Sequence, residues 1–218
     1  MADVFDYAKY LISQSLASFE DTFDGNMKLQ KLLVFANLIS FAERGIPLFN
    51  DEILAFTHGC VVEKVRHRYR GNYAEFIAES KMFSPKFSQD ECNILDLTIS
   101  LFGHLSAREL SNTNHTFDFW RNAYESSIQE NNYKDKSKAV VSLDAMAKES
   151  EKMQKIIQLF RQGKNESNCK ETINGVDFHY SHELSLTDDL LDTLYDYSLS
   201  AEDLSYSVYL DGDNLVIY

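Results

Sequence analysis

The longest apolar stretch of the chain runs from Asn26 to Gly45 and predicts a buried helix. Its apolar side chains cover roughly two-thirds of a helical wheel. They are Leu29, Leu32, Val34, Phe35, Ala36, Leu38, Ile39, Phe41 and Ala42. Asn26 can cap the first turn, and Gly45 supplies the left-handed residue that commonly ends a helix. A helix this apolar needs neighbours on several sides, so we expect it at the centre of a helical domain.

The polar residues of this helix predict two features. One is a polar ribbon on one side, formed at a spacing of seven by Gln30, Asn37 and Arg44. The other is a pair of cations, Lys28 and Lys31, in the predicted first turn, where the helix dipole disfavours positive charge. Either nearby carboxylates such as Asp21 and Asp24 neutralise the two lysines, or the lysines face an acidic partner.

The segments on either side of the central helix predict further helices. Asp3 is expected to cap a helix that runs to about Ala17. After Pro47, the apolar residues Ile46, Leu48 and Phe49 predict a short extended segment against the core. Residues 51–56 fit either a short strand or a single helical turn. Gly59 is expected to open a helix that contains Val61, Val62, Val65 and Tyr69 and ends near Gly71.

The region from 72 to 164 predicts an irregular segment followed by helices. Residues 72–91 show no clear period. Ser88 with Glu91, and Ser106 with Glu109, have the spacing of capping boxes. The first box predicts a helix over about 89–102. Ser142 is expected to cap a final helix that continues through Phe160 to Gly163.

The pattern changes after Asn165. Asn174-Gly175 between two short β-prone arms predicts a hairpin. Thr187 caps an acidic helix, and a second hairpin is expected about residues 211–214. The sequence therefore predicts a mainly α protein. Residues 1–164 form a compact helical domain around the central helix, and residues 165–218 form a small α+β appendage with ββαββ order.

The charge of the chain is concentrated in this appendage. The 218 residues carry a net charge of −13, with 34 acidic and 21 basic residues. Twelve of the acidic residues and one lysine follow residue 164, which gives that segment a charge of −11. Such asymmetry usually marks an acidic interaction surface. A basic partner is expected, and direct binding of nucleic acid by this segment is not.

A basic cluster lies in the predicted helix after Gly59. Lys64, Arg66, Arg68 and Arg70 surround His67, and they form two like-charged pairs at a spacing of four. The cluster could hold phosphates, dock the acidic segment of its own chain, meet an acidic partner or be a solvated helix face. The neighbouring composition is not basic, which favours a protein partner over nucleic acid.

A search for catalytic and metal-binding patterns finds no phosphate-binding glycine loop, zinc motif or nucleophile elbow. His58 and Cys60 have no spacing that would bring them together, and the His179–His182 pair is a weak metal pattern. The three cysteines read as free thiols in a reducing cytosol. No apolar run approaches the ~20 residues of a membrane span, and the N-terminus lacks the basic region of a secretory signal. We expect a cytoplasmic protein without cofactor or metal.

Four ordered blocks resemble a known family, the Panacea domain of SocA-like antitoxins, also described as phage-associated GepA-type proteins. The blocks are MKLQKLLVFA (27–36), GIPLF (45–49) with 52–56, HGCVVEKV (58–65) and LSARELSNTNHTFDFWRNAY (105–124). The similarity spans about residues 1–160. Cys60 stands where the family usually has proline, and Asn114 where threonine is usual. The acidic segment lies outside the resemblance.

The resemblance implies an antitoxin that binds a toxin protein and no enzymatic activity. Family members meet different toxins, including tRNA-modifying enzymes similar to small alarmone synthetases, and one lineage acts as a proteolytic adaptor. The motif positions, which we expect to be structural, are Leu29, Gln30, Leu32, Leu33, Gly45, Pro47, Gly59, His115 and Trp120. A homo-oligomer or a heterotetramer with the toxin is compatible with these features.

Three hypotheses are compatible with the sequence. The first is direct neutralisation, in which the acidic segment covers a basic active site of an RNA- or nucleotide-acting toxin as a phosphate mimic. The second is a proteolytic adaptor or DNA-binding regulator that uses residues 64–70. The third is an enzyme with His115 near Cys60 or Glu109. From charge we select as toxin-contacting candidates Lys28, Lys31, Lys64, Arg66, Arg68, Tyr69, Arg70, Asp188, Asp189, Asp192, Asp196, Asp211 and Asp213.

Overall fold

The chain forms two compact units, residues 1–156 and 157–218. The computed structural model describes residues 2–129, 134–165, 169–181, 184–212 and 214–217, with side chains for all of these except Leu16, 162–165 and Asp211. The division between the units lies within α9 (Ser150–Asn165). The predicted boundary between residues 164 and 165 falls near the end of the same helix and stays a prediction.

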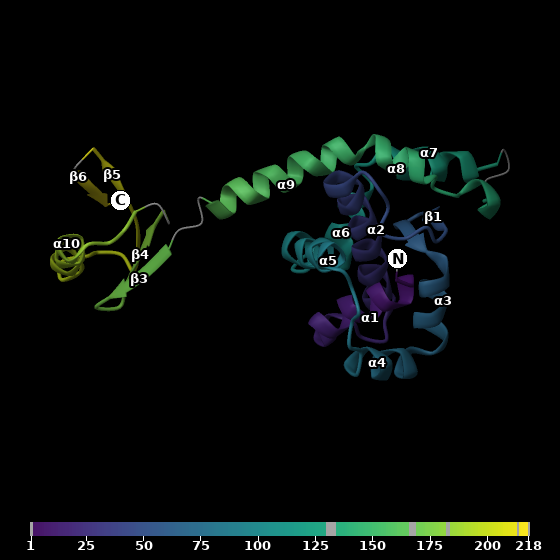
Figure 1. Cartoon of the computed structure of the whole chain (residues 1–218), viewed down its shortest axis with the longest axis horizontal. Coiled ribbons are helices and arrows are strands. Elements are labelled where there is room, and N and C mark those ends of the chain that lie inside the picture. Colours follow the sequence, from purple (N-terminus) through teal and green to yellow (C-terminus); the bar gives the residue numbers. More distant parts are fainter. Residues whose placement is uncertain (1, 130–133, 166–168, 182–183, 213, 218) are drawn as a thin grey trace. The chain divides into compact units, whose positions relative to one another are not determined.

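The first unit is built around α2 (Phe23–Arg44). Figure 1 shows this helix in the middle of the unit, with helices and a small hairpin on its sides. The elements in contact with it include α1 (Val4–Gln14), α3 (Glu63–Gly71), α5 (Gln89–Phe102), α6 (Ala107–Asn114), α8 (Leu143–Lys148) and β2 (Gly59–Val62). Every residue from Leu29 to Ala42 is buried, so the predicted central helix is confirmed.

The start of α2 differs from the prediction. Thr22, not Asn26, caps the helix, and its hydroxyl accepts a hydrogen bond from the Gly25 amide at 3.0 Å. The helix ends as predicted at Gly45, which is left-handed with φ of 71°. Because the helix begins at Phe23, Lys28 and Lys31 lie beyond its first turn, and their predicted position at the dipole was wrong.

The segment after α2 forms a hairpin where part of a helix was predicted. β1 (Ile53–Phe56) pairs antiparallel with β2, and Phe56 lies opposite Gly59. This pairing resolves the open choice at 51–56 in favour of a strand. The expected helix start at Gly59 was wrong, because Cys60, Val61 and Val62 belong to β2 and valines favour the pleated surface of a sheet. The helix begins at Glu63 and ends at Gly71, as predicted.

Further differences lie at the ends of the helical pattern. Residues 73–81, predicted as irregular, form α4 (Tyr73–Lys81), whose Phe76 and Ser80 are buried. α1 stops at Gln14 rather than near Ala17, and a 3-10 turn follows at Leu16–Ser18. The single helix predicted after Ser142 is two, α8 and α9, with a break at Glu149. The Glu149 carboxylate accepts a hydrogen bond at 2.6 Å from the Phe119 amide, at the start of α7 (Asp118–Ser127).

The capping boxes at Ser88 and Ser106 are confirmed. In each box, the serine hydroxyl accepts a hydrogen bond from the glutamate amide, and the glutamate carboxylate accepts one from the serine amide. A second 3-10 turn, Lys136–Lys138, lies before α8.

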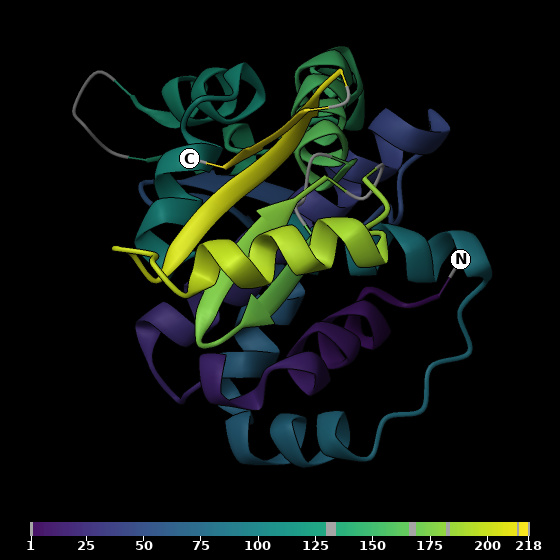
Figure 2. The same ribbon diagram turned by 90° about the vertical axis from the view of Figure 1, so that its left-hand side faces the viewer.

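The second unit has the predicted ββαββ order. β3 (Cys169–Ile173), β4 (Val176–Tyr180), β5 (Ser205–Asp211) and β6 (Asn214–Ile217) form one sheet in that spatial order. β4 and β5 are parallel, so the chain crosses over between them through α10 (Asp188–Ser198). In Figure 2, α10 lies across one face of this sheet. The buried core of the unit contains Val176, Phe178, Leu194 and Val208.

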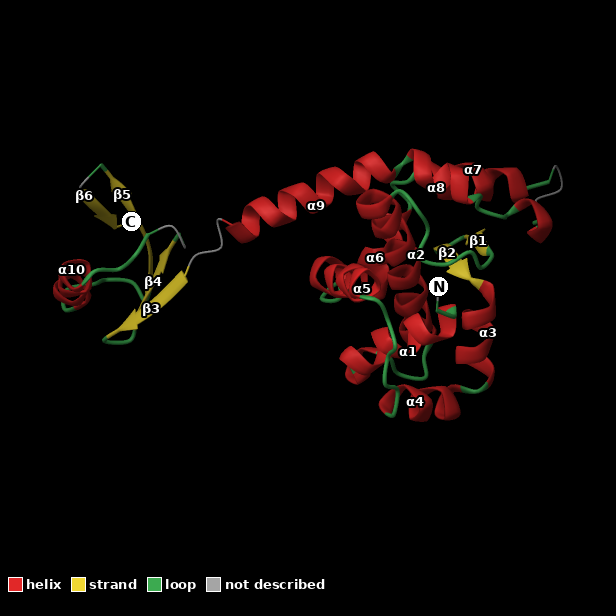
Figure 3. Ribbon diagram, viewed as in Figure 1, coloured by secondary structure: helices red, strands yellow, loops and turns green. Residues whose placement is uncertain are grey.

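The predicted fold class, mainly α with a small α+β appendage, is therefore confirmed (Figure 3). Among the described helices, none combines the length and the apolar character needed to cross a membrane.

Candidate functional site

The turn of the β1–β2 hairpin is held by buried side chains from two helices. From α2, Lys31 donates through Nζ to the Cys60 carbonyl at 2.7 Å, and Gln30 accepts from the Val62 amide at 2.9 Å. From α6, Asn114 accepts through Oδ1 from the Cys60 amide at 2.7 Å, and Ser111 donates to the His58 carbonyl at 3.0 Å. We call these four side chains the hairpin clamp. They fix the turn and β2 against the central helix.

Gly59 lies where the clamp is tightest. A Cβ atom at this position would come within 2.6 Å of Asn114 Oδ1 and 2.7 Å of Lys31 Cε. Its φ of +92° is also one that glycine adopts readily and other residues rarely do. Two independent constraints therefore require glycine at residue 59.

An aromatic stack supports the outer side of the hairpin. His115 stacks on Trp120 with ring centroids 3.9 Å apart, and Trp120 stacks in turn on Tyr124. The indole of Trp120 donates to the Phe56 carbonyl at 2.9 Å. Burial lowers the pKa of His115, and the positive charge of Lys31 lowers it further. Its Nε2 is buried and has no hydrogen-bond partner among the described residues.

A cavity of about 740 Å³ opens beside this turn. Its walls come from residues 21–31 at the beginning of α2, residues 56–61 of the hairpin, residues 66–70 of α3, and Lys134. The lining contains four basic residues, Lys31, Arg66, Arg70 and Lys134, and Asp21 as an acidic one. We call it the turn cavity. The sequence pattern singled out three of these basic residues but gave no indication that they share a concave site with Lys134.

Lys28 and Lys31 fit neither of the two predicted explanations. Lys28 Nζ donates to the carbonyl of Gly103 at 2.8 Å, at the C-terminal end of α5. Lys31 has 0% exposure, and burial lowers its pKa to about 8. Both ammonium groups bind backbone carbonyls instead of Asp21 or Asp24. Lys31 is therefore not a surface contact candidate.

The basic residues of α3 do not form one surface. Lys64 pairs with Asp51 at 2.6 Å and with Asp3 at 3.3 Å. Arg68 pairs with Glu75 and Glu79, on the side that faces α4. Arg66 and Arg70 lie on a different side and line the turn cavity. The four basic side chains of α3 therefore lie on different sides of the helix, because residues spaced by two on a helix point to different sides.

Arg66 and Tyr69, two other members of the predicted contact set, have partners within the first unit. Glu63 holds Arg66 through a hydrogen bond of 2.7 Å, so the charge of this arginine is partly balanced. Tyr69 is 1% exposed and donates to the Glu20 carbonyl at 2.7 Å. Tyr69 thus belongs to the interior of the unit. Arg70, by contrast, is exposed and has no ion pair with another described residue.

The candidate nucleophile Cys60 lies in the clamp. Burial raises the pKa of its thiol to about 12, whereas a nucleophilic cysteine needs a thiolate near neutral pH. Glu109, the other candidate partner of His115, is held in the Ser106 capping box. No group of metal-binding side chains is found in the described part of the chain, and His182 lies outside it.

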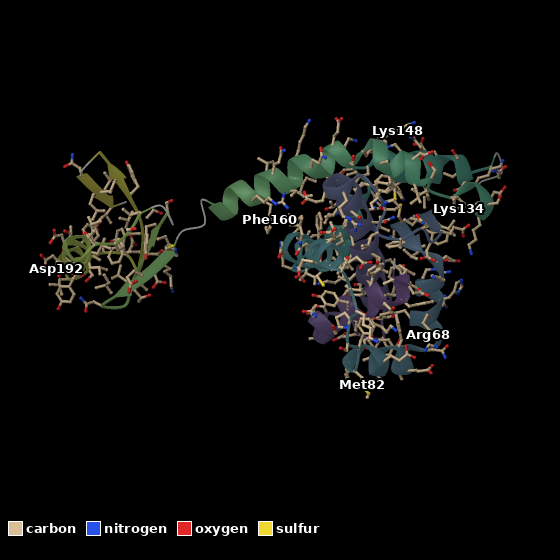
Figure 4. All side chains as sticks on the ribbon, in the orientation of Figure 1. Arg68, Met82, Lys134, Lys148, Phe160 and Asp192 are labelled. Atoms are coloured by element: carbon tan, nitrogen blue, oxygen red, sulfur yellow. The ribbon has the colours of Figure 1, made fainter. Side chains whose placement is uncertain are left out.

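The acidic candidates gather on α10 in the second unit. Asp188, Asp192 and Asp196 recur every four residues and share one face of the helix, with Asp189 beside them. All four are exposed, and none forms an ion pair with another described residue. Figure 4 shows Asp192 on the outer side of α10. Asp213 and the side chain of Asp211 lie outside the described residues.

Apolar side chains accompany these carboxylates. Tyr195 is 49% exposed and Leu199 is 66% exposed, at the same end of α10 as Asp196. We call Asp188, Asp189, Asp192, Tyr195, Asp196 and Leu199 the α10 surface. It combines unpaired negative charge with apolar contact area, which protein interfaces use together.

The family-motif positions lie in the first unit. Leu29, Leu32, Leu33 and Gln30 are buried on α2, Gly45 ends this helix, and Pro47 follows it. Leu48 and Phe49 are buried next to Pro47, and their amides both donate to Asn37 Oδ1. Ile46 is 47% exposed, so the expectation that it packs against the core was wrong.

Comparison with known proteins gives one match. Residues 29–121 match the model of a protein family described as antitoxin SocA-like, Panacea domain. Comparisons with curated proteins and with solved structures find no match. The matched segment contains most of α2, the hairpin, α3 to α6 and all four clamp residues. The first unit is therefore similar, over residues 29–121, to the SocA-like Panacea domain of antitoxins.

Proposed function

We propose that this protein is the antitoxin of a toxin–antitoxin pair and neutralises its toxin by direct protein–protein binding. The observation that carries the proposal is the Panacea-domain match over residues 29–121. An antitoxin family implies a toxin partner in general. The finer part of the proposal concerns the surface that meets the toxin.

The α10 surface is the contact we assign. The segment from residue 165 onward holds twelve acidic residues and one lysine. A toxin that acts on RNA or on nucleotides needs a basic cleft for its phosphates, and carboxylates spaced along one helix face can occupy such a cleft. The exposed Tyr195 and Leu199 add apolar area to the same surface. The proposal is that this helix covers the active site of the toxin.

The proposal assigns no reaction to the chain itself. The buried thiol of Cys60 stays protonated, and Glu109 serves to cap α6. The adaptor or DNA-binding alternative relied on a basic surface at residues 64–70. Lys64 and Arg68 are paired with carboxylates of the same unit, which argues against that use.

A growth assay tests the proposal. The protein encoded by the reading frame beside this gene is expressed from an inducible promoter, with and without the full-length antitoxin candidate. We expect the neighbouring protein alone to stop growth and the pair to restore it. The two proteins should also copurify through a tag on either one. Growth arrest that persists with both proteins present, or rescue without copurification, would contradict direct neutralisation.

The contact surface is tested by charge neutralisation in the full chain. Asp188→Asn, Asp192→Asn and Asp196→Asn together remove three charges from the α10 surface. Glu52→Gln, Glu125→Gln and Asp144→Asn remove three exposed charges from the first unit and serve as the matched control. We expect the first triple variant to lose rescue at low expression and the control to keep it.

A further inference from the structure

The turn cavity has the dimensions and the lining of a small-molecule site. Its volume of about 740 Å³ lies within the range of ligand pockets, about 300–1,000 Å³. It is formed wholly within the first unit, by the beginning of α2, the hairpin, α3 and Lys134. The cavity therefore lies in the unit that contains the Panacea-domain match, and a ligand in it is independent of the proposed function.

A buried cation without an ion pair to a described residue lies behind the wall of the cavity. Lys31 lies at 0% exposure among the lining residues, and its Nζ makes one hydrogen bond, to the Cys60 carbonyl. It forms no ion pair with a described carboxylate. An ammonium group has three donors, and a buried cation is costly unless it is paired. Because a side chain at 0% exposure cannot touch a ligand, Lys31 contributes only its positive potential to the cavity.

Positive charge continues along the cavity wall. Arg70 is exposed there without a described ion pair, and Lys134 donates to two hydroxyl oxygens, Thr57 Oγ1 at 2.6 Å and Tyr124 OH at 2.9 Å. Figure 4 shows Lys134 on the first unit, at the side that carries the hairpin. Arginine and lysine together favour a phosphate group, which accepts several charge-assisted hydrogen bonds at once.

Aromatic rings form another part of the lining. Phe23 is 66% exposed at the beginning of α2 and meets the His58 ring edge-on, with centroids 5.5 Å apart. Phe56 also lines the cavity. A flat heterocyclic base can stack on such rings, and base–aromatic stacking contributes about 1–3 kcal/mol per base in nucleic-acid complexes.

We propose that the turn cavity binds a nucleoside phosphate, with its phosphate group against the cations of Arg70 and Lys134 and its base against Phe23 and His58. Asp21, the acidic residue of the lining, would accept a hydrogen bond from a hydroxyl or amino group of the ligand. An antitoxin with such a site would respond to a small nucleotide as well as to its protein partner.

Isothermal titration calorimetry of the full-length protein tests the site. The probes are AMP, GMP, CMP and UMP, with the four matching nucleosides and inorganic phosphate as ligands that each keep one half of the chemistry. We expect at least one of the four nucleotides to bind at one site with a Kd below about 1 mM. The corresponding nucleoside and inorganic phosphate should each bind at least about tenfold more weakly, because each lacks one of the two contacts.

Variants locate the binding. Arg70→Gln and Phe23→Ala, both at exposed positions, should each weaken the nucleotide that binds by at least about fivefold. Arg68→Gln removes the same charge from the same helix outside the turn cavity and should stay within about twofold of wild type. Lys31→Met removes a buried charge behind the cavity wall and should weaken binding less than Arg70→Gln does. The fold of this variant is checked by circular dichroism. If it does not fold, Arg70→Gln and Phe23→Ala alone test whether the nucleotide binds in the turn cavity.

Two results would overturn the proposal. One is the absence of saturable binding for all four nucleotides. The other is binding that Arg70→Gln and Phe23→Ala leave unchanged, or that Arg68→Gln weakens to the same extent. Neither result would affect the assigned toxin contact, because the α10 surface lies in the other unit.

Discussion

At the scale of single residues, Gly59 and Lys31 determine the shape of the hairpin turn. An added Cβ at Gly59 would meet Asn114 Oδ1, and Lys31 binds the carbonyl of Cys60, whose amide donates to Asn114. Both residues lie within the segment that matches the Panacea domain. Asn114 and Lys31 are themselves tied to Cys60, so neither can move aside without losing a buried hydrogen bond. Each position therefore makes a specific prediction.

Gly59→Ala should destabilise the first unit by about 2–4 kcal/mol, since strain at positive φ adds to a clash with two anchored side chains. Gly45→Ala is the matched control, because Gly45 also has positive φ, at 71°, but has no atom within 4 Å of an added Cβ. The control should lose about 1 kcal/mol. Urea unfolding followed by the fluorescence of Trp120, the single tryptophan, measures both. An equal loss in the free energy of unfolding for Gly59→Ala and Gly45→Ala would show that the hairpin clamp does not confine residue 59.

Lys31 should give the first unit a stability that rises with pH. Burial lowers its pKa to about 8 in the folded state, from 10.5 in the unfolded chain. Below pH 8 the Lys31 amine is protonated in both the folded and the unfolded state. The folded state then carries the full free-energy cost of burying this charge. Above pH 8 the folded state releases the proton first, so stability increases up to about pH 10.5. The buried Cys60 thiol opposes this rise, because burial raises its pKa from 9.0 to about 12 and its contribution to stability is lost as the pH rises above 9. The Lys31→Met variant keeps this thiol, so the difference between the two proteins reports on Lys31.

The measurement compares urea unfolding of wild type and Lys31→Met at pH 7.5 and pH 9.5. We expect the free energy of unfolding of wild type to rise by about 2 kcal/mol more than that of the variant over this interval. Parallel behaviour of the two proteins would contradict the account of Lys31 as a buried cation.

The sequence could not reveal the partners of these residues. Lys31 looked like a misplaced charge near a helix end, because the helix start was placed at Asn26 instead of Phe23. Its hydrogen-bond partner, the Cys60 carbonyl, is 29 residues away in the chain. Because this carbonyl belongs to the backbone, the pattern of side-chain types along the sequence could not predict the contact. Asn114 stood out only as a departure from the family pattern, although it holds the hairpin.

At the scale of elements, α2 organises the first unit through its polar residues as well as its apolar ones. Gln30 and Lys31 bind β2, Asn37 binds the segment after Pro47, and Ser40 donates to the Ile46 carbonyl at 2.8 Å. Two of the three residues in the predicted polar ribbon, Gln30 and Asn37, are buried anchors for neighbouring backbone. A helix that is buried on all sides can use its polar positions in this way.

Asn37→Ala should therefore be costly. The amides of Leu48 and Phe49, at 2.7 and 3.2 Å from Asn37 Oδ1, would lose their acceptor in a buried position. We expect a loss of about 2–3 kcal/mol in the free energy of unfolding. Asn122→Ala, at an exposed position of α7, should change it by less than about 0.5 kcal/mol. Similar values for the two variants in urea unfolding would refute the anchoring role.

Element types were predictable where local chemistry decides them. The capping boxes, the Asn174-Gly175 hairpin and the Gly45 terminus all depend on a few adjacent residues. β2 and α4 were missed because their state is decided by neighbours: Val61 and Val62 pair with β1, and α4 packs against α1. The turn cavity was missed for the same reason, since it forms where four separate segments meet.

At the scale of the whole molecule, the two units differ in charge. The helical unit contains the segment that matches the Panacea-domain model, and the unit beyond it carries most of the net charge of −13. This asymmetry was visible in the sequence because it depends on composition alone. The order of elements in the second unit was also predictable, while the parallel pairing of β4 and β5 appears only in the structure.

Toxin binding should depend on ionic strength if the α10 surface makes the contact. Exposed charges are screened over about 8–10 Å at physiological salt. The Kd of the complex should therefore rise as sodium chloride is increased from about 50 to about 500 mM, and calorimetric titration at the two concentrations measures it. The Asp188→Asn, Asp192→Asn, Asp196→Asn variant should show a smaller rise. An equal rise for the variant and wild type would place the charged contact elsewhere.

The most direct test is the affinity of the purified neighbouring toxin for the full-length chain. At low salt, we predict that the Asp188→Asn, Asp192→Asn, Asp196→Asn variant binds at least about tenfold more weakly than wild type, because the three lost charges lie in the contact. The control with Glu52→Gln, Glu125→Gln and Asp144→Asn should stay within about twofold. No binding of the wild-type protein would contradict direct neutralisation, and equal affinities for the two triple variants would contradict the assigned surface.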